Sequence, residues 1–543
     1  MKQYTIIIFL LLTSITQGLH AQKDTTKKQS IDITSSYKPV LRNAIKINFS
    51  ATNVEPDTAK IILAYNVPAQ NLFYVYQAIP LKPLALAQDS VLDLGIRNFV
   101  KIGFGNYTTP LLHAGFSFGD GKKTLLNIYA NYTSSIGKIS NQNVADFNAT
   151  AAGSLFTPKS EVYGSVGVAQ QDYFYYGYNH DTLSFKANDI LQRYKNIAIS
   201  AGIKNKTNTS TGIQFNPNVA IQLFSNSKKA TENTIVLETP IEKTFNQKFG
   251  LKVNVIANIT TYQTLALPLN VHITNSVFSI APELMYAKPM FNIHAGLTPT
   301  WDNGELILLP NIYGEVKVKD QVFLAQAGLI GKVQKNTLQY ISAINPWIQI
   351  LATQKNTQQI ELFGGIKATI GKHFNFNVKA SFINYKNLPL FINDNIDGKT
   401  FTIVNEQSIN NIKIHADASF IKQDKFTIVA SATFNIYNTL KNNARAWGTI
   451  PFEANASLRW WAFKQLLVKS DINIFAGSPT LLANGTNINL AGGVDVSAGL
   501  EFNINKKFAA WLDVNNILNN KYQRWNNYQV YGLNVLGGIK FSF

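Results

Sequence analysis

Several segments of this chain place an apolar residue at every second position, with Asp, Ser, Glu, Asn or Lys between. The rows run over 249–259, 374–382, 412–420, 426–436 and 494–503. Such alternation gives a strand one apolar and one polar face, and about ten residues suffice for a tilted strand to cross a membrane. Strands of a soluble β-sandwich also alternate, but they are usually about half as long. The pattern predicts an all-β protein, a transmembrane antiparallel β-barrel.

Composition supports a barrel over a helical membrane protein. Hydrophobic residues make up 46% of the chain, yet charged residues reach only 15%, below the ~25% of ordinary soluble domains. Past the first residues, no apolar run approaches the ~20 residues of a membrane helix. The net charge is +18, and the basic residues fall at intervals between the expected strands. The sequence shows no basic helix, so we expect no nucleic-acid partner. The chain has no cysteine, which excludes disulfides, Cys-metal sites and anchoring through Cys.

The first 21 residues are typical of a secretory signal peptide. Lys2 gives the positive start, Ile6–Leu12 form an apolar run, and Leu19-His20-Ala21 give a small-residue cleavage site before Gln22. The apolar run is too short to span a membrane as a helix. Together with the barrel pattern, export predicts a Gram-negative outer-membrane location.

Ten short turns, most of them with Lys, separate the expected strand pairs. They lie near Gly119-Asp120-Gly121, Pro158-Lys159, Asn205-Lys206, Glu242-Lys243, Lys288-Pro289, Lys319-Asp320, Gly371-Lys372, Gln423-Asp424, Phe463-Lys464 and Lys506-Lys507. Two strands before the first turn and two after each turn give about 22 strands, within a range of roughly 18 to 24. The even number predicts that both termini are periplasmic. We assign 95–543 to the barrel.

The remaining connections are expected at the outer rim, where loops are usually longer. Leu338–Ala352 is expected there too, because Asn345-Pro346 interrupts it as a strand. The other expected outer connections are 172–190, Asp302-Asn303-Gly304, 388–400, 438–450 and 517–531.

Residues 22–94 differ from the barrel. They begin polar and Lys-rich, and Pro68, Pro80 and Pro83 punctuate their later half. Proline at that density opposes both helix and central strand. We expect a short, irregular periplasmic or lumenal segment, a candidate for a partial plug.

Charged residues on the polar faces of the expected strands are candidates for the lumen lining. They are Lys379, Lys413, His415, Asp417, Asp495, Glu501 and Asp513. They could favour certain solutes, or simply pair with one another and with the N-terminal segment. The aromatic run Tyr173, Phe174, Tyr175, Tyr176 and Tyr178 could contact a ligand from an outer loop or lie at the lipid interface.

The sequence shows no clear motif for enzyme chemistry or metal binding. We find no P-loop and no His-Glu-x-x-His pair, and we expect no Gly-x-Ser-x-Gly nucleophile turn. Asn393, Asn395 and Asp397-Gly398 imitate the start of a calcium loop, but Val404 stands where the twelfth-position Glu is needed. We therefore expect no enzyme, no cofactor and no metal site.

The C-terminal residues carry a resemblance. Asn515-Asn516-Ile517-Leu518-Asn519-Asn520-Lys521-Tyr522 leads to Tyr528, Gly532 and a closing strand that ends in Phe543. This resembles the end of TonB-dependent receptors, and the Asn- and Lys-rich style is similar to Bacteroidetes outer-membrane proteins. The resemblance implies that Phe541 and Phe543 form the signal for the barrel-assembly machinery.

The chain departs from that family in two places. Gly532 is followed by Leu533 where those receptors often have Gly-Arg, and 22–94 is shorter than their plug domain. Ile31-Asp32-Ile33-Thr34 is similar to the short strand that binds TonB. The resemblance implies uptake or passage of a solute, with TonB or a surface lipoprotein as partner. A passive porin-like channel and a scaffold or secretion partner remain alternatives.

A barrel of about 22 strands is wide enough to need filling. Residues 65–87 are proline-rich and include Leu72, Phe73, Tyr74 and Tyr76, which are poorly suited to water. Irregular backbone is tolerated inside a barrel, where water or protein satisfies its polar groups. We therefore expect this segment to enter or cap the periplasmic mouth in place of a plug.

Overall fold

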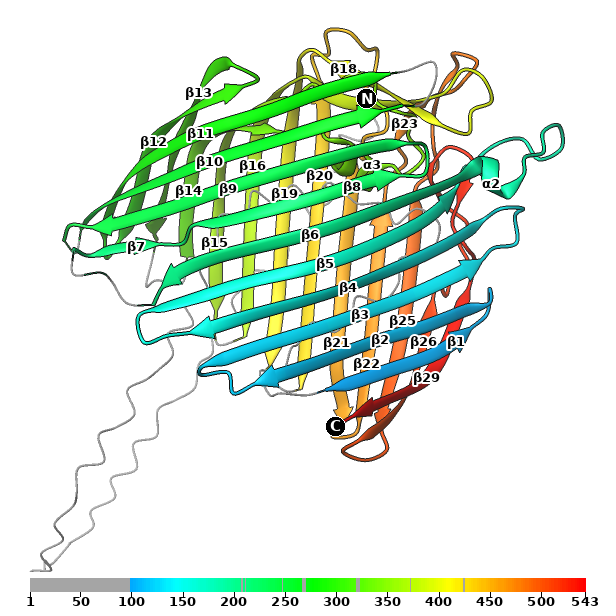
Figure 1. The fold of residues 1–543 in the computed structure, drawn as a ribbon, viewed down its shortest axis with the longest axis horizontal. Helices are drawn as coiled ribbons and strands as arrows, with labels where there is room; N and C mark the ends of the chain where they lie inside the picture. Colours follow the sequence, from blue (N-terminus) through cyan, green and yellow to red (C-terminus); the bar gives the residue numbers. More distant parts are fainter. Residues whose placement is uncertain are drawn as a thin grey trace, which may run out of the picture. The chain divides into compact units, whose positions relative to one another are not determined.

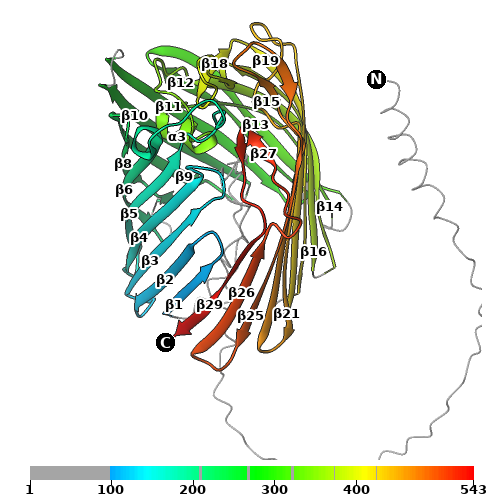
Figure 2. The same ribbon diagram turned by 90° about the vertical axis from the view of Figure 1, so that its right-hand side faces the viewer.

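The computed structural model describes residues 98–543, apart from 207–208, 210, 247, 266–269, 319–322, 372 and 423–424. These residues form a closed antiparallel β-barrel whose wall has 22 strands (Figures 1 and 2). This confirms the expected fold class and strand number. The expected signal peptide, the segment 22–94 and Ile31–Thr34 lie outside the described residues.

Each wall strand pairs antiparallel with its neighbours in the chain. In order around the ring they are β1 (Phe99–Gly105), β2 (Thr109–Gly119), β3 (Thr124–Ile136), β4 (Asn143–Phe156), β5 (Ser160–Phe174), β6 (Leu191–Asn205), β8 (Asn218–Asn226), β9 (Ala230–Thr244), β10 (Phe249–Thr264), β11 (Val271–Lys288), β12 (Phe291–Asp302), β13 (Glu305–Lys317), β14 (Phe323–Gln334), β15 (Thr357–Ile370), β16 (Phe374–Lys386), β19 (Ile409–Lys422), β20 (Phe426–Asn438), β21 (Phe452–Phe463), β22 (Leu466–Phe475), β25 (Gly493–Asn503), β26 (Phe508–Asn515) and β29 (Asn534–Ser542).

Shorter elements lie between them: β7 (Ile213–Phe215), α2 (Ala187–Ile190), α3 (Leu338–Ile344), β17 (Leu388–Asn393), β18 (Phe401–Glu406), β23 (Pro479–Leu481), β24 (Asn487–Asn489), β27 (Gln523–Trp525) and β28 (Tyr528–Gln529). β7 is the continuation of β8, since both pair with β9 and only Asn216-Pro217 separates them. Proline cannot donate to the ladder, which explains the break.

The first and last strands close the ring. β1 pairs with β29 from Phe99 opposite Ser542 to Gly105 opposite Leu536. Beyond this ladder, the Phe543 N–H donates to the Asn98 carbonyl at 3.0 Å, and the Asn98 N–H donates to the Phe543 carbonyl at 3.3 Å. The C-terminal residue therefore completes the seam, and no strand edge is left open there.

The two faces of the wall follow the alternation in the sequence. Along β25, Leu500 and Phe502 are 45% and 47% exposed on the outside, whereas Asp495 and Ser497 are buried inside. Ile414 and Ile436 show the same outward exposure on β19 and β20. A barrel wall that contacts the hydrocarbon of a membrane has an apolar exterior. Among the described residues, no helix is long and apolar enough to cross a membrane.

The expected turns at Gly119-Asp120-Gly121, Pro158-Lys159, Asn205-Lys206, Lys288-Pro289, Phe463-Lys464 and Lys506-Lys507 lie at one end of the barrel, the short-turn rim, together with Phe543. The turns expected at Lys319-Asp320 and Gln423-Asp424, and Lys372 of a further one, lie outside the described residues. Side chains that cap the turn backbone explain several of the described turns. Asp120 accepts the N–H groups of Lys122 to Thr124, closest at 2.6 Å from Lys123, and these bonds lower its pKa to about 2. Asn246 and Asn505 accept N–H groups two and three residues on in the same way.

The opposite end, the long-loop rim, differs in detail from expectation. Asp302-Asn303-Gly304 is not a long loop: Asn303 and Gly304, with φ of 51° and 91°, form a two-residue hairpin turn. The predicted turn at Glu242-Lys243 falls inside β9, which continues to Thr244. Leu388–Thr400 belongs to a hairpin, β17–β18, and the expected loop Leu338–Ala352 contains α3. The sequence reading missed a further hairpin, β23–β24.

Candidate functional site

The seven charged residues expected on polar strand faces all occupy strand positions on the side opposite the exposed apolar rows. Four of them lie on the neighbouring strands β16 and β19. Lys379 Nζ lies 2.7 Å from the Glu361 carboxylate of β15, and His415 lies 3.0 Å from Asp417. Lys413 lies two residues from His415 on the same face. The group is balanced by its own opposite charges.

A second group lies across the barrel seam. Glu501 on β25 is 2.9 Å from Lys540 and 3.6 Å from Lys469, and Asp513 on β26 is 3.3 Å from Lys101. All of these side chains lie on the inner side of neighbouring strands. The pairs explain how charged residues are accommodated at depth in the wall, since opposite charges and hydrogen bonds compensate their desolvation.

Asp495 has a different role. It is 1% exposed, accepts the Tyr522 hydroxyl at 3.0 Å and Ser497 Oγ at 3.2 Å, and so connects β25 to the loop between β26 and β29. The partners Glu361, Lys101 and Lys540 were missed in the sequence. They occupy inward alternate positions of their strands, as the seven predicted residues do, so the same alternation also predicts them as lumen-facing.

The inner wall between β3 and β6 is mostly neutral. Asn131 and Asn148 bond at 2.9 Å, and Ser165 and Ser200 at 2.7 Å. A hollow of about 300 Å³ lies there, and its charged lining residues are Glu161 and Lys204, which pair at 3.0 Å. A solute in this part of the lumen would meet amide and hydroxyl groups.

The long-loop rim is occupied by a cluster of buried aromatic and aliphatic side chains, which we name the cap. Its members come from loops around the ring and from the adjoining ends of wall strands, and include Tyr173, Tyr175, Tyr176, Tyr178, Tyr194, Phe224, Tyr262, Leu338, Ile341, Ile344, Trp347, Ile348, Phe391, Phe401, Trp525, Tyr528 and Tyr531. The β5–β6 loop follows the fifth strand and the β16–β19 loop follows the fifteenth, so they start from nearly opposite walls. The loops therefore meet across the barrel mouth.

Trp347, Tyr528 and Tyr176 form the centre of the cap. Trp347 and Tyr528 stack at 3.8 Å between ring centroids, and Tyr176 meets Tyr528 edge-on at 4.8 Å. The three are 0%, 1% and 1% exposed. The Trp347 indole N–H donates to the Phe174 carbonyl at 3.0 Å, which satisfies its polar group in the core.

Four tyrosines that we considered as ligand contacts lie inside the cap. Tyr173, Tyr175, Tyr176 and Tyr178 are at most 8% exposed, and only Phe174 of the run is half-buried. Tyr175 donates to the Ile348 carbonyl at 3.1 Å and Tyr176 to the Gln529 carbonyl at 2.6 Å. Burial raises the pKa of the Tyr176 hydroxyl well above its ordinary value. Their contacts are packing contacts with other loops.

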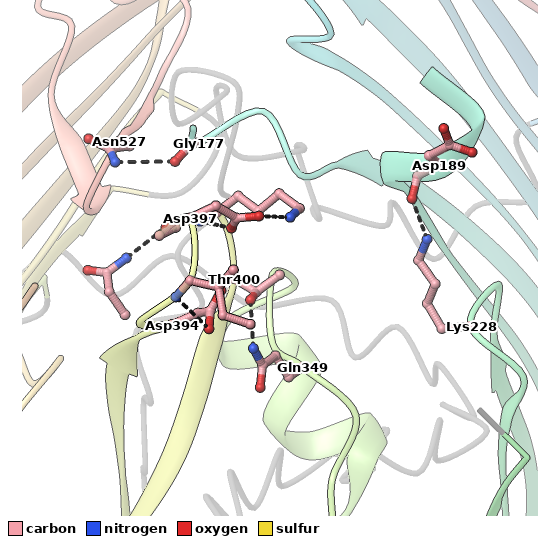
Figure 3. Close-up of polar contacts among 12 residues, drawn as sticks. Gly177, Asp189, Lys228, Gln349, Asp394, Asp397, Thr400 and Asn527 are labelled. Carbon is pink, nitrogen blue, oxygen red and sulfur yellow. Dashed lines mark hydrogen bonds and ion pairs between the residues drawn. The ribbon is translucent and has the colours of Figure 1, made fainter. Parts of the chain in front are cut away.

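Polar bonds hold the cap loops to one another. Gln349 donates to Thr400 Oγ1 at 3.0 Å, joining the β14–β15 loop to the β17–β18 hairpin, and Asn527 donates to the Gly177 carbonyl at 3.2 Å (Figure 3). Gly177 has no room for a side chain, because a Cβ would lie 2.4 Å from the Tyr528 ring.

Glu406 fixes the β17–β18 hairpin to the β20–β21 loop. Its carboxylate accepts the backbone N–H groups of Lys441, Asn442 and Asn443 at 2.8 to 3.2 Å, and the Asn443 side chain at 2.9 Å. Burial disfavours the ionised form, but these hydrogen bonds outweigh it and lower the pKa of the Glu406 carboxyl.

The wall strand β9 anchors α3. The buried Glu232 carboxylate accepts the N–H groups of Leu338 and Gln339 at 2.5 and 3.1 Å, and Thr337 Oγ1 accepts the Tyr340 N–H. A carboxylate at a helix N-terminus satisfies N–H groups that lack partners within the helix. Just before the helix, burial lowers the pKa of the Lys335 ammonium to about 8, although four oxygens accept its protons.

The turn that imitates a calcium loop lies at the tip of the β17–β18 hairpin. Asp397 pairs with Lys399 (Figure 3), and Asp394 accepts the Ile396 N–H at 3.2 Å. Asn393 donates to the Gly398 carbonyl at 3.0 Å. Within the described part of the chain, no group of three or more His, Asp or Glu residues is arranged to hold a metal ion.

Contrary to the expectation from the sequence, one segment has the Gly-x-Ser-x-Gly pattern. Gly115-Phe116-Ser117-Phe118-Gly119 does fit the letters Gly-x-Ser-x-Gly. The structure places it inside β2, where Ser117 donates to Asn127 at 2.5 Å. A nucleophile turn needs the serine between a strand and a helix, so this string carries no such site.

The Asn-rich C-terminal motif shapes the last loop. Asn516 and Asn519 adopt φ of 49° and 52°, a left-handed conformation that asparagine tolerates. Asn519 Oδ1 accepts the Leu533 N–H at 3.0 Å, and a Cβ at Gly532 would lie 2.1 Å from the same oxygen. The motif thus sets the path of the chain into the closing strand.

Fold and inner wall together define a class, the wide outer-membrane β-barrels of 22 strands. Solved structures of this class are similar over most of both chains. The FrpB iron transporter of Neisseria meningitidis (F3-3 variant) has a TM-score of 0.63 at 12% identity, covering 82% of this chain and 81% of that one. The siderophore receptor PirA of Acinetobacter baumannii has a TM-score of 0.63 at 10% identity, covering 82% and 80%.

The ferric enterobactin receptor PfeA in complex with BCV-L6 has a TM-score of 0.61 at 10% identity, covering 82% and 81%. At these identities the likeness concerns the fold. It confirms, for the fold, the resemblance to TonB-dependent receptors inferred from the C-terminal residues. No protein-family model and no curated protein matches the sequence.

Proposed function

We propose that this chain is an outer-membrane transport barrel whose cap acts as a gate for passage of a solute. The observation that carries this proposal is the cap itself: loops from several parts of the ring meet at the long-loop rim and bury Trp347 and Tyr528 in one cluster. The wall beneath the cap is lined by polar and charged groups, which suits an aqueous path. Passage requires that the cap loops separate.

In this proposal the seven charged residues line the path. They are Lys379, Lys413, His415, Asp417, Asp495, Glu501 and Asp513. The aromatic run at 173–178 supplies the packing of the gate, and Phe174 is the member left partly open to a solute. The similarity to iron and siderophore receptors supports import over a scaffolding role. A permanently open porin fits poorly with a buried aromatic cap.

Single-channel conductance in planar bilayers tests the gate. We expect the wild-type protein to conduct little, and the double variant Trp347→Ala/Tyr528→Ala to show frequent openings. Trp460→Ala, an outward residue of β21 that is 41% exposed, is the matched control and should behave as wild type. A large steady conductance of the wild type would support a passive channel instead.

The N-terminal segment provides a second test. Removing Ile31–Ala87 from the cap variant should raise conductance further if this segment occupies the periplasmic mouth. Folding of each variant is checked by resistance of the barrel to heat in detergent gels. If the variant that combines this deletion with both alanine substitutions is folded but never conducts, the result would favour a scaffold or secretion partner.

We further propose that Ile31–Thr34 contacts TonB on the periplasmic side. Deleting these four residues should abolish binding of the purified C-terminal domain of TonB to the full-length protein. Deleting Thr25–Lys28, also ahead of the barrel, is the control and should leave binding intact. Equal binding of both deletion variants would remove TonB from the proposal.

A further inference from the structure

The outer face of β6 changes character towards the long-loop rim. Ile199 and Ile197 are each 43% exposed in the apolar band, and the next two outward positions are Lys195 and Arg193. The inward residue between them, Tyr194, is buried in the cap. Among the wall strands that the structure describes, β6 alone carries cations at two successive outward positions.

The β8–β9 turn adds a third cation, Lys229, beside them. Arg193 and Ser227 exchange hydrogen bonds, with the Ser227 N–H donating to the Arg193 carbonyl at 2.9 Å, so the turn lies next to Arg193. Lys229 is exposed, whereas Lys228 donates to the Asp189 carbonyl at 2.7 Å (Figure 3) and lies over the ring of the cap residue Tyr175, so that its ammonium group faces the mouth. Three cations, Arg193, Lys195 and Lys229, therefore gather on the outer side of this stretch of the rim.

Neighbouring carboxylates compensate this charge only in part. Asp172, the outward residue of β5 opposite Arg193, holds the guanidinium with two bonds of 2.7 and 2.6 Å. Lys195 lies opposite Gln170 and Ser225, which are neutral. The exposed Asp189 carboxyl is the other acidic group of this region. The surface keeps an excess of positive charge.

These residues lie where the apolar band ends. On β5 the outward row passes from Val168, 40% exposed, to Gln170, and on β8 it passes from Leu223, 42% exposed, to Ser225. On β9, Ile235 gives way to Asn233. Polar side chains directly beyond an apolar band are expected at the depth of lipid headgroups.

We propose that Arg193, Lys195 and Lys229 bind the phosphate of a lipid headgroup in the leaflet at the long-loop rim. Positive side chains near a membrane surface attract anionic headgroups. The adjoining apolar wall of Ile197 and Leu223 contacts the acyl chains of the same lipid. A free phosphate ion would leave that apolar wall unused, which is why the occupant is a phospholipid or phosphorylated glycolipid.

Native mass spectrometry of the full-length protein in neutral detergent tests this surface, with monophosphoryl lipid A as the probe. We expect a one-to-one adduct. Lys195→Gln/Lys229→Gln should weaken it by about 25-fold, since each charge near a membrane surface contributes a factor of about five. Lys386→Gln removes an exposed cation of β16 at the same rim and is the matched control.

Three results would overturn the proposal. The double variant could bind as well as Lys386→Gln, with both shown to be folded by heat resistance. The dephosphorylated form of the glycolipid could bind with equal affinity, which would assign the adduct to apolar contact alone. Inorganic phosphate could displace the probe at equal concentration, which would make the ligand a free anion.

Discussion

The Trp347 indole lies on the phenol ring of Tyr528, with ring centroids 3.8 Å apart and planes 25° from parallel. The two residues belong to different loops, between β14 and β15 and between β26 and β29. Their contact joins distant parts of the chain at the centre of the cap. The stability of the cap should therefore depend on both rings together.

A double-mutant cycle measures this coupling. Trp347→Ala should destabilise the cap by roughly 3–5 kcal/mol through lost burial and a cavity. The coupling energy with Tyr528→Ala should be about 0.5–1.5 kcal/mol, as for other aromatic pairs. Hydrogen exchange of backbone amides in α3 and β27–β28 reports the opening of the cap. Strict additivity of the two substitutions would contradict a direct contact.

The outward face of the wall can be tested with arginine. Ile414 is 44% exposed near the middle of β19, so Ile414→Arg should destabilise the barrel by about 2–4 kcal/mol, because the charge meets hydrocarbon. Ser431→Arg is the matched inward control. Ser431 lies opposite Asp417, so an arginine at this position can pair with that carboxylate. Urea unfolding in lipid vesicles measures both. Equal losses would mean that the register of these strands is wrong.

Phe543 should be needed for insertion into the outer membrane. Its ring stacks on Phe541 at 5.2 Å and its backbone completes the seam with Asn98. Deleting Phe543 should lower the amount of folded barrel in outer-membrane fractions while leaving export to the periplasm unchanged. Phe463→Ala, at a 71% exposed aromatic of the same rim, should have little effect. Normal outer-membrane levels of the deletion variant would refute the C-terminal assembly signal.

The cap should loosen in acid because of Glu406. Its pKa is lower in the folded protein than the ordinary value of 4.5, so ionisation stabilises the fold. That stabilisation is present above pH about 4.5 and is lost as the pH falls through the lower, folded pKa. Proteolysis of the β17–β18 hairpin should accelerate below pH 4 in the wild type.

Glu406→Gln is the companion variant for this test. It keeps the size of the side chain but removes the charge that accepts the N–H groups of Lys441 to Asn443. Proteolysis of this variant should be faster at pH 7 and nearly independent of pH between 3 and 7. A wild-type pH dependence that survives the substitution would assign the acid response to another group.

The barrel itself was predictable from the sequence, because its determinants are local. Alternation at Val494–Asn503 decides which side chains face lipid, whatever the neighbouring strands are. Turn residues such as Asp120 cap the backbone within four residues, so most of the short turns that the structure describes could be located, and the one expected at Glu242-Lys243 was misplaced by a few residues. Pairs such as Lys101 with Asp513 were missed, because their register depends on the closure between β1 and β29.

The cap, by contrast, was decided by the tertiary structure. The sequence shows that aromatic residues are dense in the outer loops, at Tyr173–Tyr178 and again at Trp525–Tyr531. It does not show that Tyr176, Trp347 and Tyr528 meet, since they are separated by more than a hundred residues and carry no periodic pattern. Loops that start from separate parts of the ring can bury these side chains together only after the ring of strands has closed. The direction of an irregular loop is set by what it packs against, and that partner exists only in the folded barrel.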